Sequence, residues 1–431
     1  MSSRISHSTT AHGHQLGWSG RVLSAEHDNR STDTVGGMTT QRGFLIRRIQ
    51  LRHYRSIGSC DVALGPMTLL VGPNGSGKSN FIDSLRFVAQ SLNENLDNAL
   101  RERGGVTEVR RRSTGHPNHV GVRMEFEAPG FSGAYGFTIA ALAGEDYRVS
   151  HESCRVSPHE FGSDDAFVEV RDGTVAGSSY DVLPRVSPDR LYLVALSNLE
   201  PFRPLYDGLT GINVYNLNPD AMRRPQQPSQ GDLLARDGSN IASVLEHLRR
   251  TAPATGATVT DYLREIVPGV ESVSRVAIGT WETIEFKQSV AGSPSPWTFH
   301  ASSMSDGTLR ALGVLMALFA TDQRLPSPVG IEEPESALHP AAAGLLLEAL
   351  RGASENRQVV ATSHSPDLLD SPSIKPEELL AVRADQGTTT VASLDPASRS
   401  ALRDRLYTAG ELLRVDQLQP DLHEQPMLEF R

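Results

Sequence analysis

A short run of glycine, serine and lysine residues has the composition and spacing of a phosphate-binding loop. The run is Gly72-Pro73-Asn74-Gly75-Ser76-Gly77-Lys78-Ser79, and Asn80 follows it. Its glycines let backbone N–H groups turn toward a triphosphate, and the helix that follows adds the positive end of its dipole. Lys78 is spaced to reach the β- and γ-phosphates, and the Ser79 hydroxyl is the expected ligand of Mg²⁺. The pattern predicts a site for a nucleoside triphosphate and its magnesium ion.

Two adjacent carboxylates later in the chain have the chemistry needed for hydrolysis. The apolar run Val329-Gly330-Ile331 has the form of a strand that ends in Glu332 and Glu333. At the carboxyl end of a central strand, one carboxylate can hold Mg²⁺ through water while the next polarises the attacking water. We therefore predict that Glu332 binds the metal and that Glu333 is the general base. Glu335 is expected to be a solvated or interface residue.

A histidine and a serine-glycine turn are further candidates. His364 follows the apolar run Val359-Val360-Ala361-Thr362, one strand beyond the acidic pair. A lone histidine is usually structural, but here we predict that it bonds the γ-phosphate and helps to position the water. Ser305 and Gly307 open a helix, and taken alone they resemble any helix N-cap. Their best interpretation is a surface that caps the nucleotide of a partner subunit.

These residues need a scaffold of alternating helices and strands. A strand over residues 67–71 precedes the phosphate loop, and a long helix is expected after it to about residue 100. The last third alternates helix and strand, which predicts a parallel sheet flanked by helices. Antiparallel strands are expected at 119–127 and 135–142, irregular structure between about 155 and 235, helices at 240–250 and 259–266, and a strand pair within 273–286.

The bulk composition is that of a globular protein, and it limits the function classes. The chain has 431 residues, 38% hydrophobic residues and a formal charge of −10, so any nucleic-acid contact would need a local basic patch. Its two cysteines, Cys60 and Cys154, have no metal-ligand spacing. No apolar run approaches the ~20 residues that span a bilayer, so we expect a cytoplasmic protein with no membrane partner.

Taken together, the motifs resemble those of ABC-type ATPases of the branch that includes RecF, the SMC proteins and the OLD-family ATPases. More closely, the chain is similar to bacterial RecF-like ATPases grouped as AAA-15 and AAA-21. Two departures are that Glu332 stands where Asp is usual, and that Asp306 and Thr308 alter the signature sequence. The glutamine loop of the family has no clear counterpart, because Gln90 comes too early. The motifs that carry the resemblance are Tyr54-Arg55-Ser56-Ile57, the phosphate loop with Asn80, Asp237-Gly238-Ser239-Asn240, Met304-Ser305-Asp306-Gly307-Thr308 and Glu332-Glu333-Pro334-Glu335 with Leu338-His339-Pro340.

The resemblance implies an α/β fold: an ABC-type ATPase head with a P-loop parallel sheet core, an antiparallel β subdomain and an α/β insertion. It also implies ATP as the nucleotide, Arg55 and Ser56 near it, and a homodimer that forms when ATP binds. The expected divisions are a disordered tail (1–42), an N-terminal lobe with the phosphate loop (43–150), an insertion or lid (151–300), a C-terminal lobe with the signature, acidic pair and switch histidine (301–415), and a flexible tail (416–431).

Three functions compete. The leading one is an ATPase that acts on DNA, with a basic cluster of Arg101, Arg103 and 110–112 as a candidate contact. The second is an ATPase subunit that regulates a separate nuclease or toxin in trans without touching DNA. The nuclease domain that OLD-family enzymes carry behind the ATPase is not expected here, because only 67 residues follow His364. The third, a transporter subunit, is disfavoured because Lys78 and Ser305 are 227 residues apart.

Overall fold

The central feature of the fold is one large sheet that includes both the predicted parallel core and the predicted antiparallel strands. The computed structural model describes residues 43–112, 118–160, 162–320 and 326–422. Its principal sheet has 13 strands. In spatial order they are β8 (Thr174–Ser178), β7 (Ala166–Arg171), β6 (Tyr147–Pro158), β5 (Phe131–Ala141), β4 (His119–Ala128), β1 (Leu45–Tyr54), β2 (Ile57–Ala63), β16 (Thr388–Ser393), β15 (Leu379–Asp385), β3 (Met67–Val71), β14 (Val359–Ser363), β13 (Val329–Glu332) and β9 (Asn213–Tyr215).

The sheet has two parts of different topology. From β15 through β3, β14 and β13 to β9 the strands are parallel. From β8 to β2 the neighbours are antiparallel. β3 is buried at all five positions, as expected of a parallel strand that is covered on both faces. Leu69 and Val71 belong to one apolar core and Leu70 to the other, so the sheet separates two cores.

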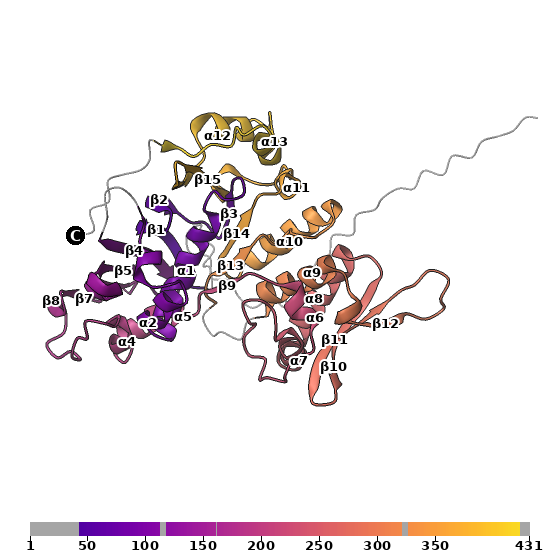
Figure 1. Ribbon diagram of the computed structural model, residues 1–431, viewed down its shortest axis with the longest axis horizontal. Coiled ribbons are helices and arrows are strands. Elements are labelled where there is room, and N and C mark those ends of the chain that lie inside the picture. Colours follow the sequence, from indigo (N-terminus) through magenta and orange to yellow (C-terminus); the bar gives the residue numbers. More distant parts are fainter. Residues whose placement is uncertain (1–42, 113–117, 161, 321–325, 423–431) are drawn as a thin grey trace, which may run out of the picture. The chain divides into compact units, whose positions relative to one another are not determined.

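Helices cover both faces of the parallel part (Figure 1). Apolar residues of α1 (Lys78–Asn93) and α5 (Arg203–Thr210) share a core with Leu70. The opposite core takes residues from α7 (Ile241–Thr251), α8 (Pro253–Ile266), α9 (Asp306–Phe319) and α10 (Ala343–Ser354). The shorter helices are α2 (Leu96–Arg101), α3 (Val106–Val109), α4 (Leu193–Leu196), α6 (Pro219–Arg223), α11 (Pro366–Leu369), α12 (Pro396–Arg403) and α13 (Ala409–Arg414).

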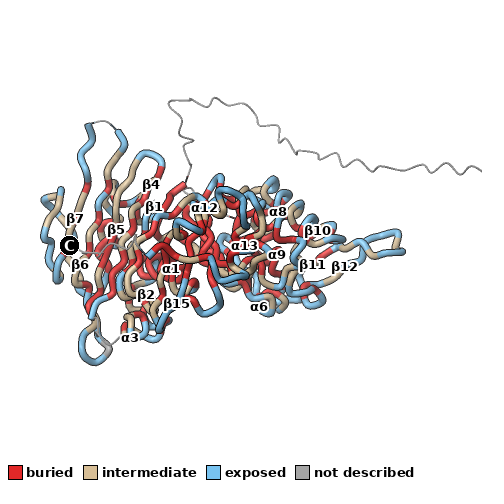
Figure 2. Tube along the Cα trace, turned by 90° about the horizontal axis from the view of Figure 1, so that it is seen from above, coloured by how far each residue is buried: buried red, intermediate tan, exposed pale blue. Residues whose placement is uncertain are grey.

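A second, three-stranded antiparallel sheet lies within the predicted insertion. It consists of β10 (Val270–Ile278), β11 (Trp281–Gln288) and β12 (Trp297–His300). Val273 and Phe286 pack into the core beside α7 and α8, while the far end of the sheet is exposed (Figure 2). Buried residues in the same view follow the central strands with α1 and α9.

The structure differs from the sequence prediction in two segments. The helix after the phosphate loop ends at Asn93 rather than near residue 100, because the Asn95 side chain accepts a hydrogen bond from Asn98 N and caps a new helix, α2. Residues 155–235 are not irregular throughout: they hold the end of β6 as well as β7, β8, α4, α5, β9 and α6. Asp172 and Gly173 both have positive φ and form the tight turn between β7 and β8.

The predicted tail over residues 1–42 lies outside the described residues, as does the end of the predicted tail over 416–431. The described segments belong to one compact unit, and the predicted divisions near residues 150 and 300 stay predictions within it. In the part of the chain that the structure describes, no helix is both long and apolar enough to cross a membrane.

Candidate active site

The phosphate loop connects β3 to α1 and packs tightly against β15 and β16. Gly75 and Gly77 have φ of 77° and 100°, which glycine adopts without the steric penalty of a side chain. A Cβ on Gly77 would lie 2.1 Å from Thr389 Oγ1, and one on Gly72 would lie 2.1 Å from Val382 O. The loop therefore requires glycine both for its conformation and for its close packing.

Lys78 begins α1 and is buried, with its side chain turned back over the loop. Its Nζ donates to Gly72 O at 2.8 Å and to Pro73 O at 2.9 Å. Burial lowers the pKa of Lys78, although the carboxylates of Glu333 and Glu335 act in the opposite direction. Ser76, Asn74 and Ser79 complete the loop: Ser76 is buried, whereas Asn74 and Ser79 are exposed.

The predicted entry motif lies against this loop. Asn80 Nδ2 donates to Ser56 Oγ at 2.6 Å, and Ser56 Oγ lies 2.7 Å from Thr389 Oγ1. Thr389 Oγ1 in turn donates to Ser76 O at 2.9 Å. Arg55 has a φ of 51° and directs one guanidinium nitrogen to Asn80 Oδ1 at 3.4 Å. Arg55, Ser56 and Asn80 are thus brought together at the start of α1.

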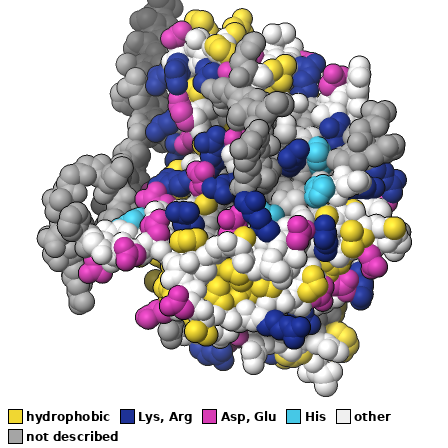
Figure 3. Space-filling view, turned by 90° about the vertical axis from the view of Figure 1, so that its left-hand side faces the viewer, with side chains coloured by type: hydrophobic (Ala, Val, Ile, Leu, Met, Phe, Trp, Pro, Cys, Tyr) yellow, Lys and Arg dark blue, Asp and Glu magenta, His cyan; other side chains and the backbone are white. Residues whose placement is uncertain are grey.

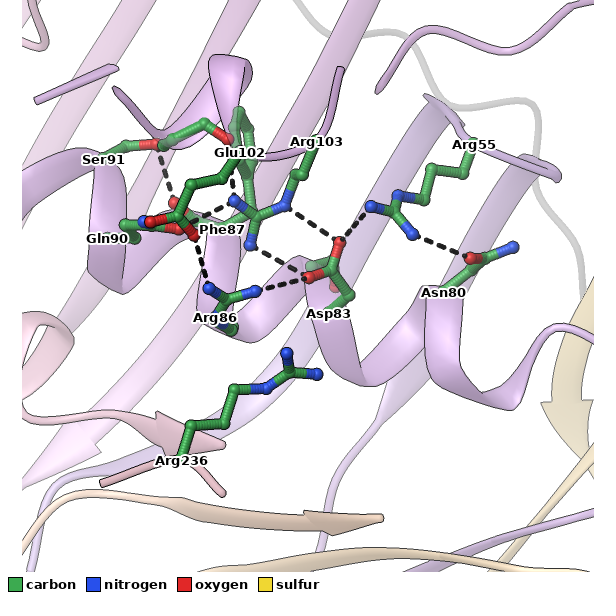
Figure 4. A network of polar contacts seen from close by, with 12 residues as sticks. Arg55, Asn80, Asp83, Arg86, Phe87, Gln90, Ser91, Glu102, Arg103 and Arg236 are labelled. Carbon is green, nitrogen blue, oxygen red and sulfur yellow. Dashed lines mark hydrogen bonds and ion pairs between the residues drawn. The ribbon is translucent and has the colours of Figure 1, made fainter. Parts of the chain in front are cut away.

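A buried ion-pair network supports α1 from below the loop (Figure 4). Asp83 accepts hydrogen bonds from Tyr54 Oη at 2.7 Å and from Arg103 Nε and Nη2 at 3.0 and 2.9 Å. Arg55 Nη2 lies 3.2 Å from the same carboxylate. Burial raises the pKa of Asp83, but Arg103, Arg55 and Tyr54 outweigh it, so the net pKa lies below its usual value.

This network corrects the role considered for Arg103. The side chain is 1% exposed, and Arg103 Nη1 also donates to Gln90 Oε1 and Ala99 O, both at 2.8 Å. Arg103 is therefore a structural residue that joins α2 to α1, not a surface contact for DNA.

The acidic residues and the histidine meet at the carboxyl edge of the parallel strands. Because β3, β14 and β13 are adjacent and parallel, the phosphate loop, His364 and the acidic pair follow strand ends at one edge of the sheet. His364 Nδ1 lies 3.0 Å from Glu333 Oε1, and Ser336 Oγ donates to Glu333 Oε2 at 3.2 Å. The predicted base and the predicted switch residue are therefore in direct contact.

The backbone at Glu333 is in a strained conformation, with a φ of 46°. Non-glycine residues rarely adopt this region, and its cost is about 1–3 kcal/mol. The Glu333 amide donates to Thr362 Oγ1 at 3.1 Å, and Arg310 Nη2 donates to the carbonyl oxygens of Glu332 and Glu333, each at 2.9 Å. Arg310 Nη1 also donates to Leu217 O at 2.6 Å. These contacts hold the strained turn and with it the direction of the Glu333 side chain.

The sequence context of Glu335 indicated a solvated or interface residue, but Glu335 does not lie in solvent. The residue is buried, and its Oε1 accepts from Ser363 Oγ at 2.7 Å. Burial raises the pKa of Glu335 above its usual value. Since the amide of Ser365 also donates to Ser363 Oγ at 3.1 Å, Glu335 helps to fix the turn that carries His364.

Glu332, the predicted metal ligand, pairs with an arginine from the insertion. Arg236 Nη2 lies 3.0 Å from Glu332 Oε1, and the Glu332 side chain is 12% exposed. A serine hydroxyl and a carboxylate are oxygen donors of the kind that Mg²⁺ prefers together with substrate phosphates. The donor set of Ser79 and Glu332 therefore fits a magnesium ion.

The predicted signature residues lie at the start of α9. Ser305 caps the helix, with its Oγ accepting from Thr308 N at 3.2 Å. A Cβ on Gly307 would lie 2.4 Å from Ala337 O, so this turn packs against the loop that follows the acidic pair. Among the described residues, no hydrogen bond or ion pair joins Ser305 or Gly307 to the phosphate loop of the same chain.

The other arginines of the candidate basic cluster have neighbours of their own. Arg101 pairs with Asp97 at 2.5 Å, and Arg112 pairs with Glu108. Arg110 Nη1 donates to Asn118 Oδ1 at 3.2 Å, and Arg111 Nη2 donates to Thr388 Oγ1 at 2.5 Å. These arginines are engaged in local contacts and do not form a free cationic patch.

Three residues of the site were not singled out from sequence: Thr389, Arg310 and Arg236. Thr389 contacts Ser76 across 313 positions of chain, and no local pattern marks such a contact. Arg310 and Arg236 adjoin the signature-like and Asp-Gly-Ser-Asn motifs, and that proximity was the one signal available.

The fold and the arrangement of the motifs together indicate which class of protein this chain resembles. The strand, phosphate loop and helix, the signature helix, the acidic strand end and the histidine occur in the order and arrangement of an ABC-type ATPase head. The chain has the fold of an ABC-type ATPase head, and it resembles the ATPases of the group that includes the SMC and OLD proteins.

Comparisons with known proteins agree with this class. A family model described as "AAA domain, putative AbiEii toxin, Type IV TA system", the AAA-21 group, matches residues 67–139 and 298–370. The OLD nuclease of Thermus scotoductus is 22% identical over 390 residues, which is 85% of this chain and 68% of that protein.

Among solved structures, an SMC head bound to the C-winged helix domain of ScpA aligns with 82% of this chain and 99% of its own, at 15% identity and a TM-score of 0.51. A second SMC head with an extended coiled coil, bound to a ScpA domain derived from Pyrococcus furiosus, aligns with 84% of this chain and 99% of its own, at 14% identity and a TM-score of 0.49.

Proposed function

We propose that this chain binds ATP with Mg²⁺ and hydrolyses it, as a RecF-like ATPase that dimerises when ATP binds and acts in DNA repair, recombination or anti-phage defence. The observation that carries the proposal is the contact between Glu333 and His364 at the strand edge that also presents the phosphate loop. The name of the OLD nuclease relative supports a link to nucleic acid.

Each residue has a defined task in this proposal. The loop amides, Lys78 and Arg55 bind the phosphates, and Ser79 and Glu332 hold Mg²⁺, which neutralises charge on the β- and γ-phosphates. Glu333 orients the attacking water and accepts its proton. His364, 3.0 Å from Glu333, keeps that carboxylate in place and donates toward the γ-phosphate.

The test is ATP hydrolysis by the purified chain and by three variants. Glu333→Gln should retain ATP binding and lose at least about 10²-fold in kcat, the usual contribution of a general base. Lys78→Ala should lose ATP binding. Glu355→Gln, an exposed carboxylate just after α10, should behave as the wild type. A Glu333→Gln protein with the wild-type rate would remove Glu333 from the role of base.

The same assay separates the two candidate biological roles. Stimulation of hydrolysis by single- or double-stranded DNA supports the RecF-like role. A rate that depends on Glu333 but is indifferent to DNA instead supports a regulatory subunit that controls a separate nuclease or toxin.

A further inference from the structure

A polar pocket on the antiparallel part of the sheet lies apart from the residues assigned to ATP. Its volume is about 450 Å³, and its walls come from β1, β4, β5 and β6. The lining contains no carboxylate, although the chain has a formal charge of −10. It consists of Arg52, His53, Asn118, His119, Gly121, Thr138, Ser150 and His151. We call it the Arg52 pocket.

The strand register explains why the pocket is open and cationic. Arg52 on β1 pairs with Gly121 on β4, and Gly121 pairs with Thr138 on β5. A glycine and a threonine beside the long arginine leave a hollow across the strands. In the part of the chain that the structure describes, Arg52 is exposed and has no ion-pair partner.

The cationic surface continues beyond the pocket along β4. Arg123 lies two positions from Gly121 on β4, so it shares a face with Arg52 about 7–8 Å away across the strand pair. No described carboxylate pairs with it either. On the other side, Arg110 donates to Asn118 of the pocket, and a second pocket that it lines also contains the carboxylate of Glu108 and the predicted nucleotide-site residues Arg55 and Ser56.

Acidic groups are present near this surface. Glu125 lies two positions from Arg123 on β4, opposite Arg48, and other carboxylates are engaged in ion pairs. Glu169 lies 3.0 Å from His151 Nε2 and 2.6 Å from Arg171, and Asp172 pairs with Arg148 at 3.2 Å. Figure 3 views the molecule from the side of β7 and β8 and shows Lys, Arg and His side chains interspersed with acidic ones on that side.

We propose that the Arg52 pocket, with Arg123 beside it, binds the phosphate backbone of a nucleic acid strand. A single small phosphate would need only the pocket, whereas Arg52 and Arg123 together fit two phosphates of a chain. Backbone phosphates attract arginine without regard to base sequence. The inference deepens the proposed function by placing its nucleic-acid partner, and it does not require hydrolysis.

The test is fluorescence anisotropy of labelled single-stranded and duplex DNA with the full chain over a range of salt. Arg52→Glu with Arg123→Glu should weaken binding at least ten-fold and lower the salt slope by about 2, because two arginines no longer neutralise a phosphate each. The pair Arg249→Glu with Arg250→Glu, exposed at the end of α7, makes the same charge change elsewhere and should leave affinity unchanged. Arg52→Gln with Arg123→Gln gives a milder variant if charge reversal impairs folding.

The outcomes separate this inference from the proposed ATPase. Lys78→Ala should still bind DNA, and Arg52→Glu with Arg123→Glu should still hydrolyse ATP in the absence of DNA. Wild-type DNA affinity in the Arg52/Arg123 variants would overturn the inference while leaving the ATPase intact. A thermal shift with inorganic phosphate that depends on Arg52, without DNA binding, would also overturn it in favour of a small anion.

Discussion

At the scale of single residues, the acidic strand end is held by contacts that ATP and Mg²⁺ would have to change. Arg236 lies 3.0 Å from Glu332, which is the carboxylate that we assign to the metal. A guanidinium and a magnesium ion compete for the same oxygens because both are cations that seek a carboxylate. We therefore propose that Arg236 opposes Mg²⁺ binding at Glu332 and so connects the insertion to the nucleotide site.

We predict that Arg236→Ala lowers the Mg²⁺ concentration needed for ATP to stabilise the protein. The ion pair is partly exposed, with 44% of the arginine side chain accessible, and such pairs contribute about 0.5–1 kcal/mol. The midpoint of a Mg²⁺ titration, read as a thermal shift in the presence of ATP, should fall about 2- to 5-fold.

Arg224→Ala, an exposed arginine of the same segment, is the control and should leave the midpoint unchanged. A higher midpoint in Arg236→Ala would mean that Arg236 assists the nucleotide rather than opposing the metal.

The sequence suggested roles where local spacing carries the signal, and those roles stay predictions, whereas it missed the contacts that depend on tertiary structure. Lys78, Ser79, Glu333 and His364 were singled out because each follows a short apolar run that reads as a strand. The burial of Glu335 depends on Ser363, 28 positions away, and no pattern around Glu335 indicates it. Arg103 looked like part of a basic cluster because its partner, Asp83, lies 20 positions earlier on α1.

At the scale of elements, α1 is anchored in its first turns. Lys78 begins the helix, and Asp83 anchors it to Tyr54 on β1 and to Arg103 after α2. Arg103 also lies 5.1 Å from the centroid of the Phe87 ring. Because Asp83 follows Lys78 within the first turns of the helix, loss of the anchor should loosen the helix that presents the phosphate loop.

We predict that Arg103→Ala destabilises the protein by about 3–5 kcal/mol, because it leaves the buried carboxylate of Asp83 without its main partner. Chemical unfolding at pH 7 measures the loss. Arg101→Ala removes an exposed pair with Asp97 and should cost no more than about 0.5 kcal/mol. Equal, small losses in the two variants would contradict a supporting role for Arg103.

The lowered pKa of Asp83 fixes the direction of the pH dependence. Its stabilisation is present above the unfolded-state pKa of about 3.9 and is lost as the pH falls through the lower folded-state value. The stability difference between wild type and Asp83→Asn should therefore be largest near neutral pH and should shrink below about pH 4.

Element prediction succeeded where periodicity was strong and failed where one side chain ended a helix. The alternation after residue 300 predicted α9, β13, α10 and β14 correctly. The break at Asn95 and the hairpin around Asp172-Gly173 were both missed, although an N-cap asparagine and an Asp-Gly turn are signals that the sequence contains. The joining of all 13 strands in one sheet depends on long-range pairing and has no local signal.

At the scale of the whole molecule, the proposed dimer depends on signature residues that lie apart from the phosphate loop of their own chain. Ser305 and Gly307 contact Thr308 and the Ala337 loop of their own chain, so a second copy would have to bring them to the phosphate loop. Ser305 is exposed, and the start of α9 adds a positive helix end that suits a phosphate. This arrangement favours a head-to-tail dimer with two nucleotides between the copies.

We predict that Glu333→Gln forms a dimer in ATP and Mg²⁺, and that adding Ser305→Asp prevents it. Asp caps a helix as well as Ser does, so α9 should persist, but its carboxylate would repel the partner's triphosphate. Ser305→Asn keeps the cap without the charge and should still dimerise. Size-exclusion chromatography with light scattering gives the mass, and nucleotide binding by the monomer should be the same in both variants. A Ser305→Asp protein that dimerises as readily as Ser305→Asn would place the signature turn outside the interface, because the added charge would then face no phosphate.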